Sequence, residues 1–337
     1  MTTPNATRPH PPWIIRFRAS SGRYLRWISL ATTIGMLVIL TMGDWVVNAN
    51  AAQGCGRSWP LCDGRLLPTI ATPQTLIEFS HRFVVAIVSI GIIALAAGTA
   101  LRTPHRTETR ILAPALIFFL VLQSVLGGLA VLQPQSPPIL ALHLGVSLIS
   151  FATVLLTALL LWGESSTDLL RDHPVPPAFR RLTWITMIYL YALIYLGAFV
   201  RHTNAQLACS GWPLCNGSFL PQPHFLILVN YAHRLSALIG IFLFVLLFWR
   251  AAGLRSSRPD LFWGSAIAFV GLLLQSLSGA YVALSGMALP AALLHGSILA
   301  IPFGALSYLC MHVLPRGIRQ TATIQPRRLL QSGLTAK

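Results

Sequence analysis

Charged side chains are scarce in this chain. Only 9% of its 337 residues are Asp, Glu, Lys or Arg, against about a quarter in an ordinary soluble domain. Hydrophobic residues make up 55% of the sequence, and the mean hydropathy is +0.68. This balance excludes a pair of soluble domains and indicates an integral membrane protein.

The chain also lacks the short segments of alternating polarity that mark the strands of a membrane β-barrel. It contains long apolar runs instead, and about 20 such residues suffice for one transmembrane helix. The first run follows a basic tail and has no small-residue cleavage site, so we interpret it as a retained helix and not a signal peptide. We therefore expect an all-α integral membrane protein with eight transmembrane helices. The expected spans are 26–48, 76–101, 110–133, 139–162, 181–203, 226–252, 261–284 and 289–313.

Acidic residues are rarer than basic ones: 8 Asp and Glu stand against 24 Lys and Arg, which gives a net charge of +16. Such a charge would suit a nucleic-acid-binding protein, but the basic residues collect in the even-numbered connections and in the terminal tails. The odd-numbered connections hold only Arg57, Arg65 and Arg201. Because basic residues concentrate on the cytoplasmic side of a membrane protein, we expect both termini to be cytoplasmic and no nucleic-acid partner.

Short motifs recur in the two halves of the sequence. "CGRSWPLCDG" returns as "CSGWPLCNG", "EFSHR" as "NYAHR", "QSVLGG" as "QSLSGA" and "LHLGVS" as "LHGSIL". Four crossings bring a chain back to its starting side, so the repeats predict two pseudo-symmetric four-helix bundles with the same orientation. The expected divisions are a cytoplasmic N-terminal tail (1–25), an N-terminal half (26–162), a cytoplasmic linker (163–180), a C-terminal half (181–313) and a cytoplasmic tail (314–337).

Four histidines fall in predicted helices at equivalent places. His81 precedes His143 by 62 residues, and His233 precedes His295 by 62. Each lies about 7 Å below the outer end of its helix, at 1.5 Å per residue. Two imidazoles that face each other across a four-helix bundle suit axial ligation of haem iron, whereas tetrahedral zinc calls for more ligands. A proton relay, a quinone site or interhelical hydrogen bonding are the alternatives.

One acidic residue distinguishes the two predicted pockets. Glu78 precedes His81 by three residues, so both side chains share a helical face and the acid is expected to look into the first pocket. The second copy has the neutral Asn230 at this position. This asymmetry predicts a division of labour, with chemistry in one half and a helper cofactor in the other. The alternative is an interfacial carboxylate paired with Arg82 or Arg65.

An arginine follows the first histidine of each predicted pair. Arg82 follows His81, and Arg234 follows His233. Both are expected near the outer rim of their pockets, where they could pair with haem propionates. The alternative is that their heads simply reach the membrane surface.

Four of the five cysteines lie in the first and fifth connections, which the charge pattern places on the extracytoplasmic side. Because that side is oxidising, the pairs Cys55–Cys62 and Cys209–Cys215 are each expected to form a local disulfide. A redox-active thiol pair is the rival interpretation. The fifth, Cys310, is expected to be a small core residue.

Taken together, these motifs resemble the haem A synthases of the Cox15/CtaA type over about residues 24–313. The resemblance implies an oxidoreductase that oxidises the C8 methyl of haem O to a formyl group by successive hydroxylations, giving haem A for cytochrome oxidase. The motifs that carry it are the paired "C…WPLCxG" loops, "ExxHR" at Glu78–Arg82, "LHLG" at Leu142–Gly145, "AHR" at Ala232–Arg234 and "LHG" at Leu294–Gly296.

The resemblance also implies roles for individual residues. His81 and His143 would face the iron of the substrate haem, and His233 and His295 would ligate a haem b that carries electrons. Glu78 would be the catalytic acid, transferring a proton or stabilising a cationic intermediate. The implied setting is the bacterial plasma membrane, with a haem O synthase that supplies the substrate, an electron donor and a homo-oligomer among the expected partners.

Two other functions fit parts of the sequence. A di-haem electron-transfer cytochrome would account for the histidines, and a thiol-oxidising or redox-sensing membrane protein would account for the cysteines. The chain also departs from the family pattern: "NANAAQGCG" and "TNAQLAC" replace glycine-containing runs before the cysteine pairs, and Asp44 stands where a small residue is usual.

Overall fold

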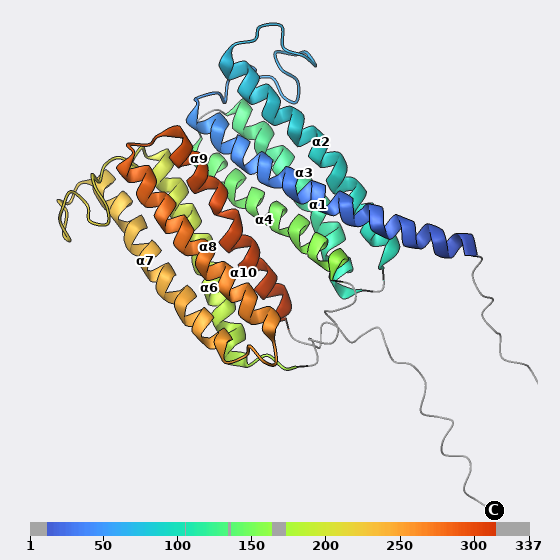
Figure 1. Cartoon of the computed structure of the whole chain (residues 1–337). Helices are drawn as coiled ribbons and strands as arrows, with labels where there is room; N and C mark the ends of the chain where they lie inside the picture. Colours follow the sequence, from blue (N-terminus) through green and yellow to red (C-terminus); the bar gives the residue numbers. More distant parts are fainter. Residues whose placement is uncertain (1–11, 105, 134–135, 164–172, 315–337) are drawn as a thin grey trace, which may run out of the picture.

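All regular elements are helical in the part of the chain that the computed structural model describes, residues 12–104, 106–133, 136–163 and 173–314 (Figure 1). Eight helical spans there are long and apolar enough to cross a membrane, which confirms the predicted all-α membrane class. The helices are α1 (Pro12–Asn48), α2 (Pro73–Arg102), α3 (Thr107–Leu132), α4 (Pro137–Trp162), α6 (Pro177–His202), α7 (Phe225–Ala252), α8 (Pro259–Leu284), α9 (Leu289–Ile298) and α10 (Ala300–His312).

The first helix is longer than predicted. It begins at Pro12, whereas the expected span begins at residue 26. Hydropathy marks only the apolar part of a helix, and arginine has a high helix propensity, so the helix continues through residues that we interpreted as a tail. Proline suits a helix start, because an N–H at the first helical position would have no partner inside the helix.

The last span is divided, although we predicted one helix over 289–313. α9 and α10 are separated at Leu299. Pro302 has no N–H, and a proline ring clashes with the carbonyl four residues before it, which here belongs to Ile298. The two pieces together still form a single membrane crossing, Leu289–His312.

The helices pack as two groups that meet along a shared face. Helices α1 to α4 pack against one another, and so do α6 to α10 (Figure 1). The groups meet where α1 lies against α9 and where α4 lies against α6 and α10. Accordingly, 72% of the central part of α4 is buried, a larger share than in any other candidate span. The buried apolar residues form two large cores, one around Phe151 and Leu95 and the other around Phe303 and Leu190, and a third, small cluster of Val200, Ala205 and Val229.

The pseudo-symmetry of the two groups and the cytoplasmic placement of the termini stay predictions. So do the proposed divisions of the chain, because residues 1–11, 164–172 and 315–337, on which parts of both tails and of the linker fall, lie outside the described residues.

Candidate functional site: two histidine pairs beneath two disulfide loops

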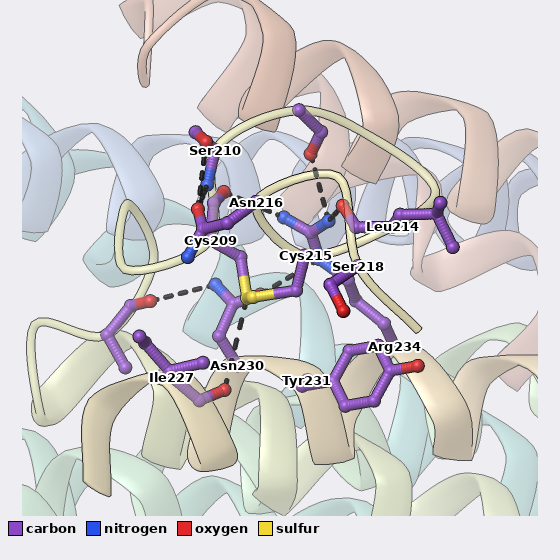
Figure 2. The surroundings of a disulfide bond; sticks show 12 residues. Cys209, Ser210, Leu214, Cys215, Asn216, Ser218, Ile227, Asn230, Tyr231 and Arg234 are labelled. Atoms are coloured by element: carbon purple, nitrogen blue, oxygen red, sulfur yellow. Dashed lines mark hydrogen bonds between the residues drawn. A yellow bond between two sulfur atoms is a disulfide. The ribbon is translucent and has the colours of Figure 1, made fainter. Parts of the chain in front are cut away.

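Two long loops, residues 49–72 and 203–224, lie at the same end of the helices (Figure 1). A disulfide joins Cys55 to Cys62 in the first loop, and another joins Cys209 to Cys215 in the second. Figure 2 shows the second disulfide between its loop and the start of α7. The fifth cysteine, Cys310, is free and buried in α10, in line with a core role.

Each disulfide loop ends in the same tight turn. Asp63 and Gly64 have φ values of 49° and 74°, and Asn216 and Gly217 have φ values of 54° and 75°. Two successive positive φ values define the type I′ turn, for which Asp-Gly and Asn-Gly are the preferred sequences. The "DG" and "NG" that close the repeated motifs were therefore a signal for these turns, which the sequence analysis did not use. Antiparallel bridges join Cys62 to Arg65 and Cys215 to Ser218.

In the N-terminal half, Glu78 and Arg82 tie the loop to α2. Glu78 is only 3% exposed. Its Oε2 accepts a hydrogen bond of 2.8 Å from the backbone N–H of Cys55, and its Oε1 accepts one from Arg82. Arg82 also donates to the carbonyls of Ser58 (2.8 Å) and Leu61 (2.7 Å). The acid and the arginine thus form one network with the loop backbone.

In the C-terminal half, Asn230 and Arg234 make the corresponding network (Figure 2). The side-chain amide of Asn230 donates to the carbonyls of Ala205 (2.8 Å) and Gln206 (3.1 Å), and its oxygen accepts from Arg234 Nε at 2.9 Å. Both networks hold a loop against a helix, but their hydrogen bonds run in opposite directions. Glu78 accepts a hydrogen bond from its loop, whereas the side-chain amide of Asn230 donates hydrogen bonds to its loop. Arg234 also donates to the carbonyls of Gly211 (2.9 Å), Leu214 (2.9 Å) and Cys209 (3.0 Å).

These contacts bear on the predicted roles of the polar residues. The carboxylate of Glu78 is paired with Arg82. This pairing agrees with the alternative interpretation, in which the acid is an interfacial partner of an arginine. The other contact of the carboxylate is with the backbone of the loop. Arg82 and Arg234 are held by the loops, so they do not simply reach for the membrane surface. The catalytic role of Glu78 and the pairing of either arginine with a propionate stay predictions.

The four predicted histidines occupy matched positions beneath the loops. His81 and His233 are each the ninth residue of their helices, α2 and α7. His143 and His295 are each the seventh residue of α4 and α9. His81 and His143 belong to the first group of packed helices, and His233 and His295 belong to the second.

Each imidazole faces a glycine on the neighbouring helix, a feature that the sequence analysis missed. A Cβ added at any of these glycines would lie within van der Waals distance of the histidine Cε1 or closer, so the missing side chain leaves room for the ring. The repeats contained the signal, because the glycines recur at equivalent places in both halves. The pairs are Gly43 with His81 (3.7 Å), Gly127 with His143 (3.3 Å), Gly197 with His233 (3.1 Å) and Gly279 with His295 (3.1 Å).

A glutamine approaches the second histidine of each pair. The side-chain nitrogen of Gln123 lies 3.0 Å from His143 Nδ1, and that of Gln275 lies 3.3 Å from His295 Nδ1. Ser278 Oγ lies 3.0 Å from the same nitrogen of His295. These contacts restrict the orientation of each imidazole ring. "QS" was part of the repeated motif, but the sequence analysis gave it no role.

The other histidine of each pair has an unsatisfied nitrogen. Nδ1 of His81 and Nδ1 of His233 are buried without a hydrogen-bond partner among the described residues. Buried polar atoms are nearly always paired, so these two nitrogens call for an explanation. Two imidazoles that face each other would suit the axial positions of a haem iron. Among the described residues, His, Cys, Asp and Glu form no group of three or more that could hold a metal ion by themselves.

Comparison with known proteins gives one consistent result. The family model COX15-CtaA, described as cytochrome oxidase assembly protein, matches residues 26–306. A heme A synthase of Symbiobacterium thermophilum is 40% identical over 304 residues, which cover 89% of this chain and 98% of that protein. Heme A synthases of Lysinibacillus sphaericus and Geobacillus thermodenitrificans are 39% and 38% identical, over 86% and 90% of this chain and 95% and 96% of their own lengths. The chain therefore belongs to the COX15-CtaA family of cytochrome oxidase assembly proteins, as its motifs predicted.

Proposed function

We propose that this chain is a haem A synthase, a membrane oxidoreductase that oxidises the C8 methyl of haem O to the formyl group of haem A. The family match and the names of its bacterial relatives support this function. The structural observation that carries it is the presence of two matched histidine pairs, each with glycines opposite its rings.

The two pairs have different proposed tasks. His81 and His143 would hold the iron of haem O, the substrate, and His233 and His295 would hold a haem b that passes electrons. When bound, the haem groups supply the redox chemistry, and the protein supplies binding, orientation and electrostatics. Of the two sites, only the first has an ionisable residue, Glu78, at the position that Asn230 fills in the second.

Glu78 is the proposed catalytic acid of the first site. Its carboxylate is buried three residues before His81, and the N–H of Cys55 holds Oε2 in place. In this position Oε1 and Oε2 can take up or release a proton, a task that the side-chain amide of Asn230 cannot perform.

The first disulfide loop packs against α3 beside this site. The ring of Trp59 lies 3.2 Å from the place of a Cβ on Gly128, and the preceding residue, Gly127, faces His143. The loop therefore extends across α3 directly beside the second histidine of the substrate site. Arg82 holds the loop in this position through two loop carbonyls.

The chain is a multi-pass membrane protein with bacterial relatives. Beyond that, we propose that it lies in the plasma membrane with its disulfide loops on the extracytoplasmic side and its tails and linker in the cytoplasm. The N-terminal half (26–162) would be catalytic, and the C-terminal half (181–313) would carry haem b. A haem O synthase would supply the substrate, a separate donor would supply electrons, and the enzyme would work as a homo-oligomer.

Co-expression with a haem O synthase tests the proposed function. We expect extracted pigments to contain haem A, identified by mass, when the intact protein is present and only haem O when His81→Ala replaces it. The purified His81→Ala protein should still contain haem b, because the second histidine pair is intact. Haem O that stays unconverted beside the intact protein would contradict the proposal.

A di-haem electron-transfer cytochrome is the second candidate, since the two histidine pairs are alike in depth and surroundings. Such a protein would bind the same bis-histidine haem in both halves and leave haem O unchanged. The same pigment extraction decides between the two functions. The third candidate, a thiol redox protein, would lose function on Cys55→Ser and retain it on His81→Ala.

A further inference from the structure

An acidic side chain crosses from one half of the molecule to the other at the level of the histidines. Asp44 of α1 points at Gly296 of α9, where an added Cβ would lie only 1.6 Å from Asp44 Oδ2. About one helical turn away, Thr41 Oγ1 and Ser297 Oγ are 2.8 Å apart. The carboxylate thus fills a space that exists only because residue 296 is a glycine, and it belongs to a polar contact between α1 and α9.

Asp44 lies between the two histidine pairs. The residue before it, Gly43, faces His81, and the residue that its carboxylate touches, Gly296, directly follows His295. The backbone of Asp44 therefore borders the substrate site, while its side chain reaches the site of the second histidine pair. Neither the proposed ligation nor the proposed acid chemistry uses this residue.

The neighbouring opposite charge is Arg201, near the end of α6. Its Nη2 lies 3.5 Å from the carbonyl oxygen of Val47, which follows Asp44 by three residues on α1. Its Nε is buried without a hydrogen-bond partner among the described residues. Asp44 and Arg201 thus place an acidic and a basic side chain where the halves meet, in surroundings that screen charges poorly.

The equivalent position of the other half carries no charge. Gly43 and Gly197 face the first histidines of their pairs, so Asp44 corresponds to Ala198. Only one of the two sites therefore receives a carboxylate from its neighbour. An acidic side chain at one of two matched positions and an apolar side chain at the other would give two similar haem sites different reduction potentials.

We propose that Asp44 lowers the reduction potential of the haem held by His233 and His295. This inference rests on the proposed function, because it presupposes a haem b at that pair. Oxidised haem iron carries one more positive charge than reduced iron, so a carboxylate close to an axial ligand stabilises the oxidised form. Arg201 acts in the opposite direction, and the balance of the two charges sets the potential.

The test is a spectroscopic redox titration of the purified full-length protein. Asp44→Asn retains the shape of the side chain and removes its charge, and we expect the reduction equilibrium of haem b to shift at least tenfold towards the reduced form, which is about 59 mV for one electron. Arg201→Gln should shift it towards the oxidised form. The double variant should return towards the potential of the intact protein, since both charges are then absent.

Asp63→Asn is the matched control, because it removes the same charge from an exposed position in the first disulfide loop and should leave the potential of haem b unchanged. An unchanged haem b potential in Asp44→Asn would overturn the inference. Shifts of equal sign in Asp44→Asn and Arg201→Gln would also overturn it, because they would indicate a general disturbance of the haem site and not an effect of charge. If Asp44→Asn fails to bind haem, the inference is tested by Arg201→Gln alone: a shift towards the oxidised form supports it, and no shift overturns it. Failure of the proposed function has a separate signature, namely an intact protein that contains no haem b or leaves haem O unconverted.

Discussion

Glu78 is the residue on which the proposed chemistry depends. Glu78→Gln retains the size of the side chain but removes its capacity to carry a proton. We expect haem A production to fall by about 10²–10⁴-fold, the usual contribution of a positioned acid or base. Pigment extraction from cells that also make haem O measures the effect.

Asn230 provides the control for this substitution. Gln at position 78 places an amide beside the guanidinium of Arg82, so the loop network must be checked separately. Asn230→Ala breaks the corresponding network of the other half without touching any acid. If Asn230→Ala lowers haem A production as much as Glu78→Gln does, or if Glu78→Gln produces normal haem A, the catalytic role is wrong.

Gly279 makes room for the ring of His295. In Gly279→Ala the new Cβ would lie 3.1 Å from His295 Cε1, closer than an ordinary contact, so the ring must move. We expect an altered haem b absorption spectrum or a lower haem b content. Gly253→Ala is the matched control, because its nearest neighbour would be 3.6 Å away. A spectrum of Gly279→Ala identical to that of Gly253→Ala would contradict the role of this glycine.

Some residues of the candidate site could be predicted from the sequence, and others could not. Histidines and cysteines are costly or reactive in a membrane protein, so their repetition at fixed spacing identified them. Glycines are common in membrane helices, and the four that face the histidines acquire meaning only when the neighbouring helix is known. The hydrogen bond from Cys55 to Glu78 was equally hidden, because it depends on how a loop folds back over a helix.

Arg234 anchors the loop of residues 203–224 to α7, so its substitution tests how this loop is held on the helix. Its guanidinium donates to loop carbonyls and to Asn230. Arg234→Gln would remove most of these bonds. Hydrogen bonds to charged groups are worth about 1.5–3 kcal/mol each, and these are worth less because they are partly exposed to solvent. We expect faster hydrogen exchange across residues 203–224. Arg250→Gln, at the other end of α7, is the control, and equal exchange rates in both variants would refute the anchoring role.

The helices were predicted to within a few residues wherever apolar runs end in polar or proline-rich segments. The two differences have separate physical causes. Hydropathy does not register a helix that continues into a basic segment, so the start at Pro12 was missed. Pro302 was visible in the sequence, but a proline in a membrane helix can be tolerated or can interrupt the helix, depending on its neighbours. Here Pro302 packs against Gly271 of α8, and the helix is interrupted.

At the scale of the whole molecule, the sequence predicted two similar halves but not the surface by which they meet. That surface depends on small residues that admit large ones from the other half. Gly145 of α4 leaves room for the hydroxyl groups of Tyr191 and Tyr195 of α6, and Gly304 of α10 leaves room for Leu155 of α4. Such pairs involve residues far apart in the chain, and no local pattern identifies them.

Gly304 tests whether this surface stabilises the molecule as one unit. A Cβ at this position would lie 2.7 Å from Leu155 Cδ2 and 3.3 Å from Phe151 Cε1, so Gly304→Leu would overpack the contact between α10 and α4. We expect a loss of about 1–3 kcal/mol of stability, measured as a lower Tm in detergent. Both haems should be released together, because α4 carries His143 and also packs against the C-terminal helices. Separate release of one haem at the original Tm would mean that the halves are stable independently.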